Sequence, residues 1–217
     1  MTENDIELFA IQLLEQQGFT YINGVEIAPD STNPARASFE EVVLKDRLEE
    51  AIQRINPDIP FEAQQDAVKQ VFRIASPDVL TNNEVFHRFL TEGISVTKRI
   101  DGQDRGDRVF LIDFEHPLAN DFLVVNQFTV VENGVNKRPD IILFVNGLPL
   151  VVIELKNATD ENTTIQSAFR QIETYKAMIP SLFTFNAFSV ISDGLEAKGG
   201  DDFGRPKPVH GLEIPRR

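Results

Sequence analysis

Hydrophobic residues in the first part of the chain recur with the period of a helix. Ile6 and Leu13 share one helical face, and Gly18 follows where the end of a helix favours a left-handed residue. The region from Ser38 to about Leu90 keeps a helical period through three further apolar stripes. The pattern therefore predicts a short amphipathic first helix and a helical insertion over residues 38–93.

Each helix of the expected insertion has a recognisable start. Ser38 with Glu41 has the spacing of a capping box, in which a hydroxyl and a carboxylate bond to the first free amides of a helix. Pro60 suits the start of the second helix, because an amide there would have no partner within the helix. Thr81 with Glu84 repeats the capping-box spacing before the third helix.

After Gly93 the pattern changes to that of strands. Strands are expected over residues 94–100, 108–114, 122–131, 140–145, 148–155 and 188–191, with a helix over 163–179 before the last of them. The runs joined by Asn146-Gly147 are almost wholly apolar, as in strands buried on both faces, and this dipeptide is a strong hairpin signal. The expected fold class is α/β (α+β), with a mixed central β-sheet flanked by helices.

Glycine and proline interrupt every periodic pattern near the C-terminus. Residues 199–217 contain four of the twelve glycines and three of the twelve prolines. We therefore expect a folded domain over residues 1–198 and a loose C-terminal tail whose truncation is tolerated.

The charge balance excludes a protein that coats nucleic acid with a generally basic surface. The 217 residues include 21 basic and 34 acidic ones, for a formal net charge of −13. With no cysteine, there is no disulfide and no thiolate metal site. There is no signal-peptide pattern, no apolar run near the ~18 residues of a membrane helix and no phosphate loop for ATP. We expect a cytoplasmic protein.

Three charged residues stand out in the apolar hairpin. Asp140 begins one buried strand, and Glu154 and Lys156 lie at the end of the next. Charges left unpaired in an apolar sheet are costly, so they need a metal, each other or water. Two carboxylates with a strand carbonyl suit Mg²⁺ or Mn²⁺, and a lysine beside them can position a water and stabilise charge on a phosphate. The set fits metal-assisted phosphodiester hydrolysis, whereas Glu-x-Lys alone usually means two solvated charges.

The hairpin register decides whether the two carboxylates can share a metal. A two-residue loop of Asn146 and Gly147 would place Asp140 opposite Ile153 and turn Glu154 to the other face. A three-residue loop, or an equivalent bulge, would place the carboxylates on one face. We expect the odd-length loop or its equivalent.

Other polar residues have both a functional and a structural interpretation. Gln171 and Tyr175 are four residues apart and share a helical face, from which they can reach the end of the sheet or simply pack beside it. Arg138 can contact a phosphate or form a surface ion pair. The three histidines have no metal-binding spacing, so we expect surface or packing roles for them.

A series of motifs runs through the second half of the chain: Asn126-Gln-Phe-Thr-Val-Val-Glu, Lys137-Arg-Pro-Asp, Asn146-Gly-Leu-Pro-Leu, Glu154-Leu-Lys, Gln171 with Tyr175, and Ser192-Asp-Gly. Together they closely resemble the N-terminal nuclease region of the restriction (R) subunit of type I restriction-modification enzymes. The resemblance runs from about Arg105 to Lys198, and the first helix with Glu7 is similar to that family's opening segment. The stretch from Ser38 to Leu90 matches no motif.

The resemblance implies a PD-(D/E)xK nuclease fold, in which Pro139-Asp140 is the "PD" and Glu154 and Lys156 are the "ExK". Asp140 and Glu154 would then bind Mg²⁺, with Mn²⁺ as an alternative, and Lys156 would position the attacking water. These residues are the expected catalytic centre of a Mg²⁺-dependent deoxyribonuclease.

Three further residues receive roles from the same resemblance. Gln171 and Tyr175 match the Q-x-x-x-Y motif, which is associated with cleavage and DNA contact near the scissile phosphate. Glu7 on the first helix would support the site. A glutamate there is equally consistent with a solvated residue near a helix start, where the helix dipole favours its charge.

The resemblance also implies a larger enzyme acting on double-stranded DNA. Family members continue into a tandem motor that binds ATP, which this sequence does not contain, and they work with methylation and specificity subunits. The expected function is therefore the DNA endonuclease domain of a type I restriction enzyme. The alternative is a catalytically silent acidic docking module, because a net charge of −13 repels DNA.

Overall fold

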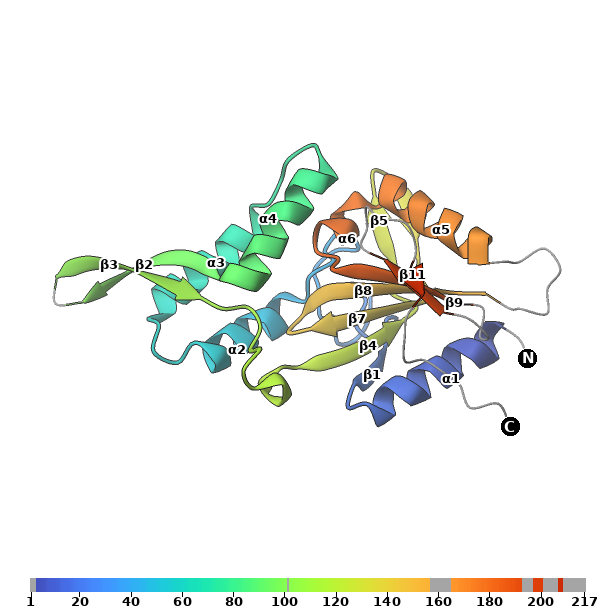
Figure 1. The fold of residues 1–217 in the computed structure, drawn as a ribbon, viewed down its shortest axis with the longest axis horizontal. Helices are drawn as coiled ribbons and strands as arrows, with labels where there is room; N and C mark the ends of the chain where they lie inside the picture. Colours follow the sequence, from blue (N-terminus) through green and yellow to red (C-terminus); the bar gives the residue numbers. More distant parts are fainter. Residues whose placement is uncertain (1–2, 101, 157–164, 193–196, 201–206, 209–217) are drawn as a thin grey trace.

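The computed structural model describes residues 3–100, 102–156, 165–192, 197–200 and 207–208. Within these ranges a central sheet is flanked by helices, and a group of three helices with a hairpin extends from one end of it (Figure 1). None of the described helices combines the length and apolar character that a membrane crossing requires.

The helices are α1 (Glu3–Gln16), α2 (Lys45–Ile55), α3 (Phe61–Phe72), α4 (Val79–Glu92), the 3₁₀ turn η1 (Pro117–Ala119), α5 (Ile165–Met178) and α6 (Pro180–Thr184). The strands are β1 (Thr20–Asn23), β2 (Ile94–Ile100), β3 (Gln103–Val109), β4 (Phe122–Asn126), β5 (Val130–Glu132), β6 (Val135–Lys137), β7 (Ile141–Val145), β8 (Leu148–Leu155), β9 (Phe188–Ser192), β10 (Ala197–Gly200) and β11 (Lys207–Pro208).

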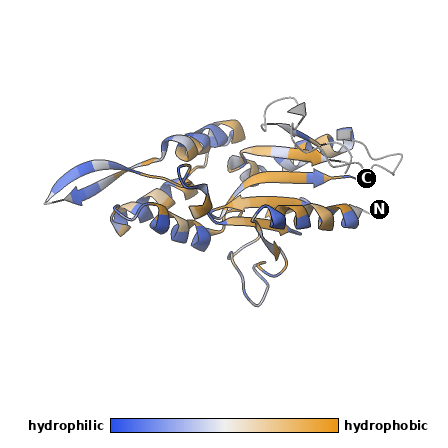
Figure 2. Cartoon of the chain, turned by 60° about the horizontal axis from the view of Figure 1, so that its bottom comes forward, coloured by the Kyte–Doolittle hydropathy of each residue, from blue (hydrophilic) through white to orange (hydrophobic). Residues whose placement is uncertain are grey.

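The main sheet is mixed. In the described part of the chain its seven strands lie in the order β1-β4-β7-β8-β9-β10-β11, with parallel pairing of β1 to β4 and of β8 to β9 and antiparallel pairing elsewhere. The central strands are the most hydrophobic part of the chain (Figure 2). This arrangement confirms the expected α/β fold with a mixed sheet between helices.

The two faces of the sheet differ in their cover. Helices α1 and α5 lie on opposite sides of the sheet (Figure 1). The face under α5 includes Ile142, Phe144 and Val152, all with no exposed surface. On the other face α1 packs against β1, β4 and β8. The face under α5 is therefore part of the hydrophobic core, and the candidate site lies next to it.

The three expected helices of the insertion are present as α2, α3 and α4. Helix α3 packs against β2, and the β2–β3 hairpin projects from the molecule as a hydrophilic arm (Figures 1 and 2). Asn83 on α4 joins the insertion to the main body, because its amide donates to the carbonyl oxygens of Phe183 and Asn186. The limits of the insertion at residues 38 and 93 stay a prediction.

The expected start of the first inserted helix is wrong. The Ser38–Glu41 capping box does not form, because the Glu41 carboxylate accepts from the Ala37 amide at 2.7 Å and helix α2 begins only after Leu44. The Leu44 amide donates to the carbonyl of Gly147 at 2.9 Å, in the β7–β8 turn. A distant tertiary contact thus decides the chain direction before α2.

Of the other two predicted helix starts, one is confirmed and one is wrong. Pro60 lies directly before α3, as expected. Helix α4 begins earlier than expected, since the Asp78 carboxylate accepts from the Thr81 amide at 3.0 Å and so takes the capping position assigned to Thr81. Asp and Thr are both good N-caps, so the local sequence alone did not separate them.

Two expected strands also need correction. The strand at 108–114 is wrong: β3 covers Gln103–Val109 and pairs with β2 over seven positions. The strand at 122–131 ends at Asn126 because Gln127 has a positive φ of 55°, and residues 130–132 pair instead with 135–137 in a separate hairpin. Helix α6, after Pro180, was not expected.

Two short segments of the expected C-terminal tail, residues 199–200 and 207–208, lie in strands. The expected strand at 188–191 is confirmed as β9, but Ala197–Gly200 then pairs with it, and Lys207–Pro208 pairs with β10. The expectation of a loose tail from residue 199 is therefore wrong for these residues, and truncation at Gly199 would remove strands from the sheet. Residues 201–206 and 209–217 lie outside the described part of the chain. The division at residue 198 otherwise stays a prediction.

We predict that Gly147→Ala destabilises the fold far more than Gly102→Ala. Both glycines have a positive φ, 77° and 76°, which costs about 1–2 kcal/mol for another residue. A Cβ at Gly147 would also collide with the Leu44 carbonyl and lie 2.9 Å from the Leu48 amide nitrogen, whereas a Cβ at Gly102 meets nothing within 4 Å. Thermal unfolding should show a clearly larger loss for Gly147→Ala; equal losses would contradict the packing of α2 on this turn.

Candidate active site

The β7–β8 hairpin fixes the relative position of the two candidate metal ligands. Its turn has two residues, Asn146 and Gly147, both with positive φ as a type I′ turn requires. The three-residue loop is therefore wrong. The equivalent bulge is present: the register shifts between Leu143 and Phe144, so that Ile141 pairs with Ile153. One step further, Asp140 is level with Glu154.

Pro149 explains the place of the bulge. It pairs with Phe144 at the register shift, and a proline has no amide hydrogen to give to the neighbouring strand. Prolines within sheets concentrate at bulges and edges for this reason. Pro149 is thus the sequence signal that could have located the bulge in advance.

Asp140, Glu154 and Lys156 come together at the end of β8. The Asp140 carboxylate accepts from the Leu155 amide at 2.7 Å, which holds it against the strand that carries Glu154. Lys156 Nζ donates to Glu154 Oε1 at 2.8 Å. The Lys156 amide donates to the Ser192 carbonyl, so the backbone at the end of β8 is anchored to β9.

Glu154 is a buried carboxylate with one oxygen still available. Only 1% of the residue is exposed, and its Oε2 has no hydrogen-bond partner among the described residues. Burial and the nearby charge of Asp140 raise the pKa of Glu154 from 4.5 to about 7, against the opposing effect of Lys156. Burial therefore disfavours the charged form of this carboxyl group unless a cation lies beside it.

Gln171 and Tyr175 lie at the same site, as the sequence indicated. Gln171 Nε2 donates to the Tyr175 hydroxyl at 2.9 Å, and that hydroxyl is 3.4 Å from the carbonyl oxygen of Arg138. Burial, followed by the negative charge of Glu154, raises the pKa of Tyr175 above its usual range. The tyrosine is thus buried beside the carboxylates, and the exposed Gln171 connects it to the surface.

An open pocket of about 390 Å³ adjoins the carboxylates. It is lined by Thr129, Asn136, Lys137, Arg138, Gln171 and Tyr175. No acidic side chain is in this lining, although the chain as a whole has thirteen more acidic than basic residues. Tyr175 lines the pocket and also lies beside Glu154, so it connects the pocket to the carboxylate site.

Arg36 holds one wall of this pocket, a role that the sequence did not reveal. It is 4% exposed, its guanidinium lies 3.7 Å from the centre of the Phe128 ring, and it donates to the Thr129 carbonyl at 2.5 Å. Burial lowers the pKa of Arg36 to about 10, and the Glu41 charge opposes this shift. Arg36 therefore stays charged at neutral pH and fixes Thr129.

Glu7 is close to this region but is engaged elsewhere. Asn126 Nδ2 donates to Glu7 Oε1 at 2.6 Å, and Asn126 Oδ1 accepts from the Tyr21 hydroxyl at 3.0 Å. Asn126 pairs with Ile141, so this network is one strand away from Asp140. The buried Asn126, at the end of an apolar strand, is the polar residue that sequence reasoning missed as the partner of Glu7.

The donor set is compatible with a cation that keeps water ligands. No group of three or more Asp, Glu or His side chains in the described residues is arranged to hold a metal, so Asp140 and Glu154 offer two carboxylates. Mg²⁺ is commonly held by one or two carboxylates, with waters and phosphate oxygens as its other ligands. The buried Oε2 of Glu154 is the atom that would contact such a cation.

The two described histidines lie in structural contacts, and Arg138 lies at the pocket. His87 Nε2 is 3.2 Å from the carbonyl oxygen of Asn186, and His116 lies 3.4 Å from Asp113, which fits packing and surface roles. His210 lies outside the described residues. Arg138 lines the pocket, where its surface exposure makes it available to a ligand.

We predict that Glu154 makes stability depend on pH in the absence of divalent metal. Because its pKa is raised in the folded state, the free energy of unfolding should fall by up to about 3 kcal/mol as pH rises from 4.5 to about 7. Glu154→Gln should remove this dependence, so the variant gains stability relative to the wild type between pH 5 and pH 8. Thermal unfolding with EDTA tests this, and Glu173→Gln on α5 is an exposed control. A pH-independent difference would contradict the burial of Glu154.

Comparison with known proteins assigns the chain to a family. Residues 1–207 match the family described as type I restriction enzyme R protein N terminus. The type I restriction enzyme HindI endonuclease subunit of Haemophilus influenzae is 39% identical over 212 residues, which are 96% of this chain and 20% of that protein. The MjaIXP endonuclease subunit proposed for Methanocaldococcus jannaschii is 36% identical over 198 residues, which are 90% of this chain and 19% of that protein.

These relatives support the motif resemblance over a larger part of the chain. The chain spans about a fifth of their length. The match includes the first helix, whose similarity to the family was already noted, and the inserted helices, for which the sequence motifs were silent. The chain therefore belongs to the family of N-terminal regions of type I restriction enzyme R proteins.

Proposed function

We propose that this chain is the DNA endonuclease unit of a type I restriction enzyme, and that it hydrolyses phosphodiester bonds with a divalent cation held by Asp140 and Glu154. The observation that carries the proposal is the buried Glu154 Oε2, which has no hydrogen-bond partner in the described region and lies beside a second carboxylate. The name of the relatives as endonuclease subunits supports the reaction class.

The side chains divide the chemistry between them. A bound Mg²⁺ or Mn²⁺ would stabilise negative charge on the phosphate and lower the pKa of a water. Lys156 Nζ lies 2.8 Å from Glu154 Oε1, so its ammonium group is placed beside the carboxylates to orient the attacking water. The water oxygen bonds to phosphorus, the bond from phosphorus to the leaving oxygen breaks, and the proton leaves with solvent. Asp140 and Glu154 orient the cation.

The pocket beside the carboxylates is suited to the DNA backbone. Lys137 and Arg138 provide cations, and Asn136, Thr129 and Gln171 provide neutral hydrogen-bonding groups. Phosphate contacts of this kind determine most of the affinity for DNA and make it dependent on salt. The local excess of cations lets a strand approach a protein whose overall charge repels it.

Other subunits and the motor belong to the whole enzyme. Sequence recognition by specificity and methylation subunits, and ATP-dependent movement on DNA, are proposals that rest on the family resemblance. A cytoplasmic location and a supporting role for Glu7 likewise stay predictions. With neither the motor nor the other subunits, we expect weak DNA binding and slow cutting by this chain alone.

We predict that the isolated chain nicks plasmid DNA slowly at low salt with Mg²⁺ or Mn²⁺. Asp140→Ala and Lys156→Ala should each reduce the rate by about 100-fold or more, because each removes a group needed at the reacting phosphate. Glu173→Gln is the matched control and should cut normally, and EDTA should abolish cutting. Metal-independent cutting, or full activity of both alanine variants, would contradict these roles.

Metal binding also distinguishes an enzyme from a silent docking module. Calorimetric titration with Mn²⁺ should give a binding signal for the wild type that Asp140→Ala removes. A folded protein with no such signal would favour the docking module.

We predict that Lys137→Ala and Arg138→Ala weaken DNA binding without preventing metal binding. Each should lower the slope of log affinity against log salt by about one, because one phosphate contact is lost. Fluorescence anisotropy with a labelled duplex in EDTA measures this apart from cutting. Lys69→Ala and Arg73→Ala, on exposed residues of the helical insertion, are the controls. An equal effect of the controls would contradict a specific backbone site.

A further inference from the structure

Four large hydrophobic side chains are exposed at one end of the central sheet. Phe110 is 44% exposed, Phe114 64% and Leu118 97%, all in the segment that leads from β3 to β4, and Phe188 at the start of β9 is 44% exposed. We name these four residues the front patch. Isolated exposed apolar residues are ordinary, but a contiguous group in a folded protein usually marks an interaction surface.

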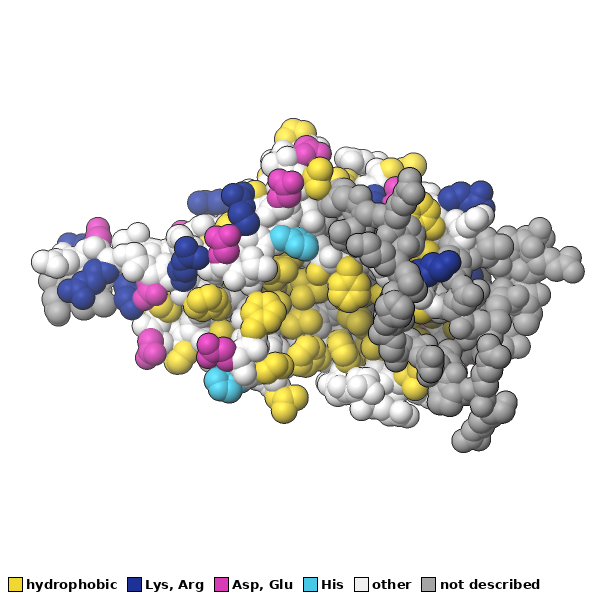
Figure 3. All heavy atoms as spheres, in the orientation of Figure 1, with side chains coloured by type: hydrophobic (Ala, Val, Ile, Leu, Met, Phe, Trp, Pro, Cys, Tyr) yellow, Lys and Arg dark blue, Asp and Glu magenta, His cyan; other side chains and the backbone are white. Residues whose placement is uncertain are grey.

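The fold brings the two parts of the front patch together. The side-chain Nδ2 of Asn146 donates to the Leu111 carbonyl at 2.8 Å, which ties the β3–β4 segment to the β7–β8 turn. The Ala187 amide donates to the Leu150 carbonyl at 2.7 Å, which places Phe188 beside the first part of β8. Hydrophobic side chains gather over this region of the molecule (Figure 3).

The front patch continues a sheet face that is only partly covered. Phe188 pairs with Val151, and the partly buried Val190 pairs with Ile153, on the face opposite to Glu154. Helix α1 packs on this face at β1, β4 and β8. An apolar sheet face is stabilised by packing against another layer, so the partly exposed end near β9 is a place where another element would fit.

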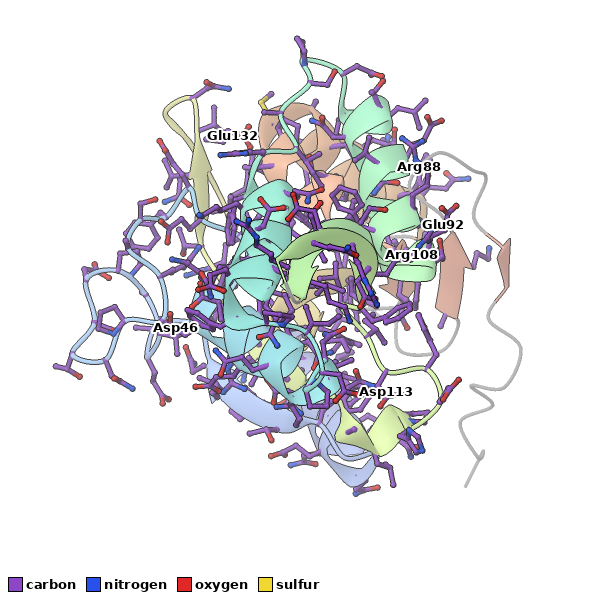
Figure 4. The ribbon with its side chains drawn as sticks, turned by 90° about the vertical axis from the view of Figure 1, so that its left-hand side faces the viewer. Asp46, Arg88, Glu92, Arg108, Asp113 and Glu132 are labelled. Carbon is purple, nitrogen blue, oxygen red and sulfur yellow. The ribbon has the colours of Figure 1, made fainter. Side chains whose placement is uncertain are left out.

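Several charged residues lie on the same side of the molecule as the front patch. Arg88, Glu92, Arg108 and Asp113 lie on one side in the end-on view (Figure 4), the side that faces the viewer in Figures 1 and 3. An apolar centre with charged groups around it is the usual construction of a specific protein interface. The mixed signs of these charges call for a protein surface with both signs and not for a nucleic acid.

We infer that the front patch is the docking surface for the polypeptide that follows this unit in the longer R proteins. In the two relatives about four fifths of the chain lies outside the matched region, so a long further polypeptide accompanies this unit there. Strand β10 runs beside β9 as far as Gly200, which is opposite Ser189 and next to Phe188, and β11 then runs back antiparallel to β10. A second copy is the weaker candidate because two copies, each with a net charge of −13, repel each other.

The inference rests on family membership and not on nuclease activity, and hydrogen exchange tests it. This chain replaces the matched region of the H. influenzae HindI endonuclease subunit, and the hybrid is compared with the chain alone. Amide exchange over residues 110–118 and 187–190 should slow by about tenfold or more in the hybrid. Exchange over the β2–β3 arm, residues 97–100 and 102–106, should not change.

Substitutions then identify the contact. Leu118→Glu with Phe188→Glu should restore fast exchange in the hybrid, whereas Phe61→Glu, at a residue 60% exposed outside the patch, should not. Thermal unfolding of the isolated variants establishes that they fold. Unchanged exchange at the patch, or an equal effect of Phe61→Glu, would overturn the inference. A dimer of the isolated chain that Phe188→Glu dissociates would assign the patch to a second copy instead.

Discussion

The burial of a single carboxylate, that of Glu154, is the constraint on which the rest of the site depends. A glutamate with 1% exposure at the end of an apolar strand is costly unless its charge is matched. Lys156 donates a hydrogen bond to one oxygen of Glu154, and the nearby Asp140 and Tyr175 both influence the pKa of Glu154. The result is a carboxyl group with a pKa of about 7, and under the proposed function a divalent cation would replace its proton.

This arrangement requires the bulge in the β7–β8 hairpin. In a regular hairpin with the same two-residue turn, Glu154 would face the α1 side of the sheet, and Asp140 would be left without it. The extra residue beside Pro149 shifts the register by one, and the type I′ turn at Asn146-Gly147 is preserved. The same turn also accepts a hydrogen bond from the Leu44 amide. Both the start of α2 and the geometry of the site therefore depend on this turn.

Electrostatics separates the site from the rest of the protein. The chain carries a net charge of −13, yet the pocket beside Glu154 is lined by Lys137 and Arg138 and by no acidic residue. Buried Arg36 fixes the wall at Thr129 without contributing an exposed charge. Under the proposed function, a local cationic pocket within an acidic protein would favour DNA that is delivered to the site over DNA captured from solution.

The sequence by itself determined the elements whose signal is local and the residues whose chemistry is conspicuous. The amphipathic helices, the apolar hairpin and Asp140, Glu154, Lys156, Gln171 and Tyr175 follow from periodicity, turn chemistry and motif. Tertiary structure decided the features that depend on partners far away in sequence. The contact between Leu44 and Gly147 sets the start of α2, and β10 pairs with β9 in spite of its glycine-rich sequence. The hydrogen bond between Glu7 and Asn126 is a third such feature. Local propensity is worth only tenths of a kcal/mol per residue, so contacts between segments far apart in sequence outweigh it wherever they compete.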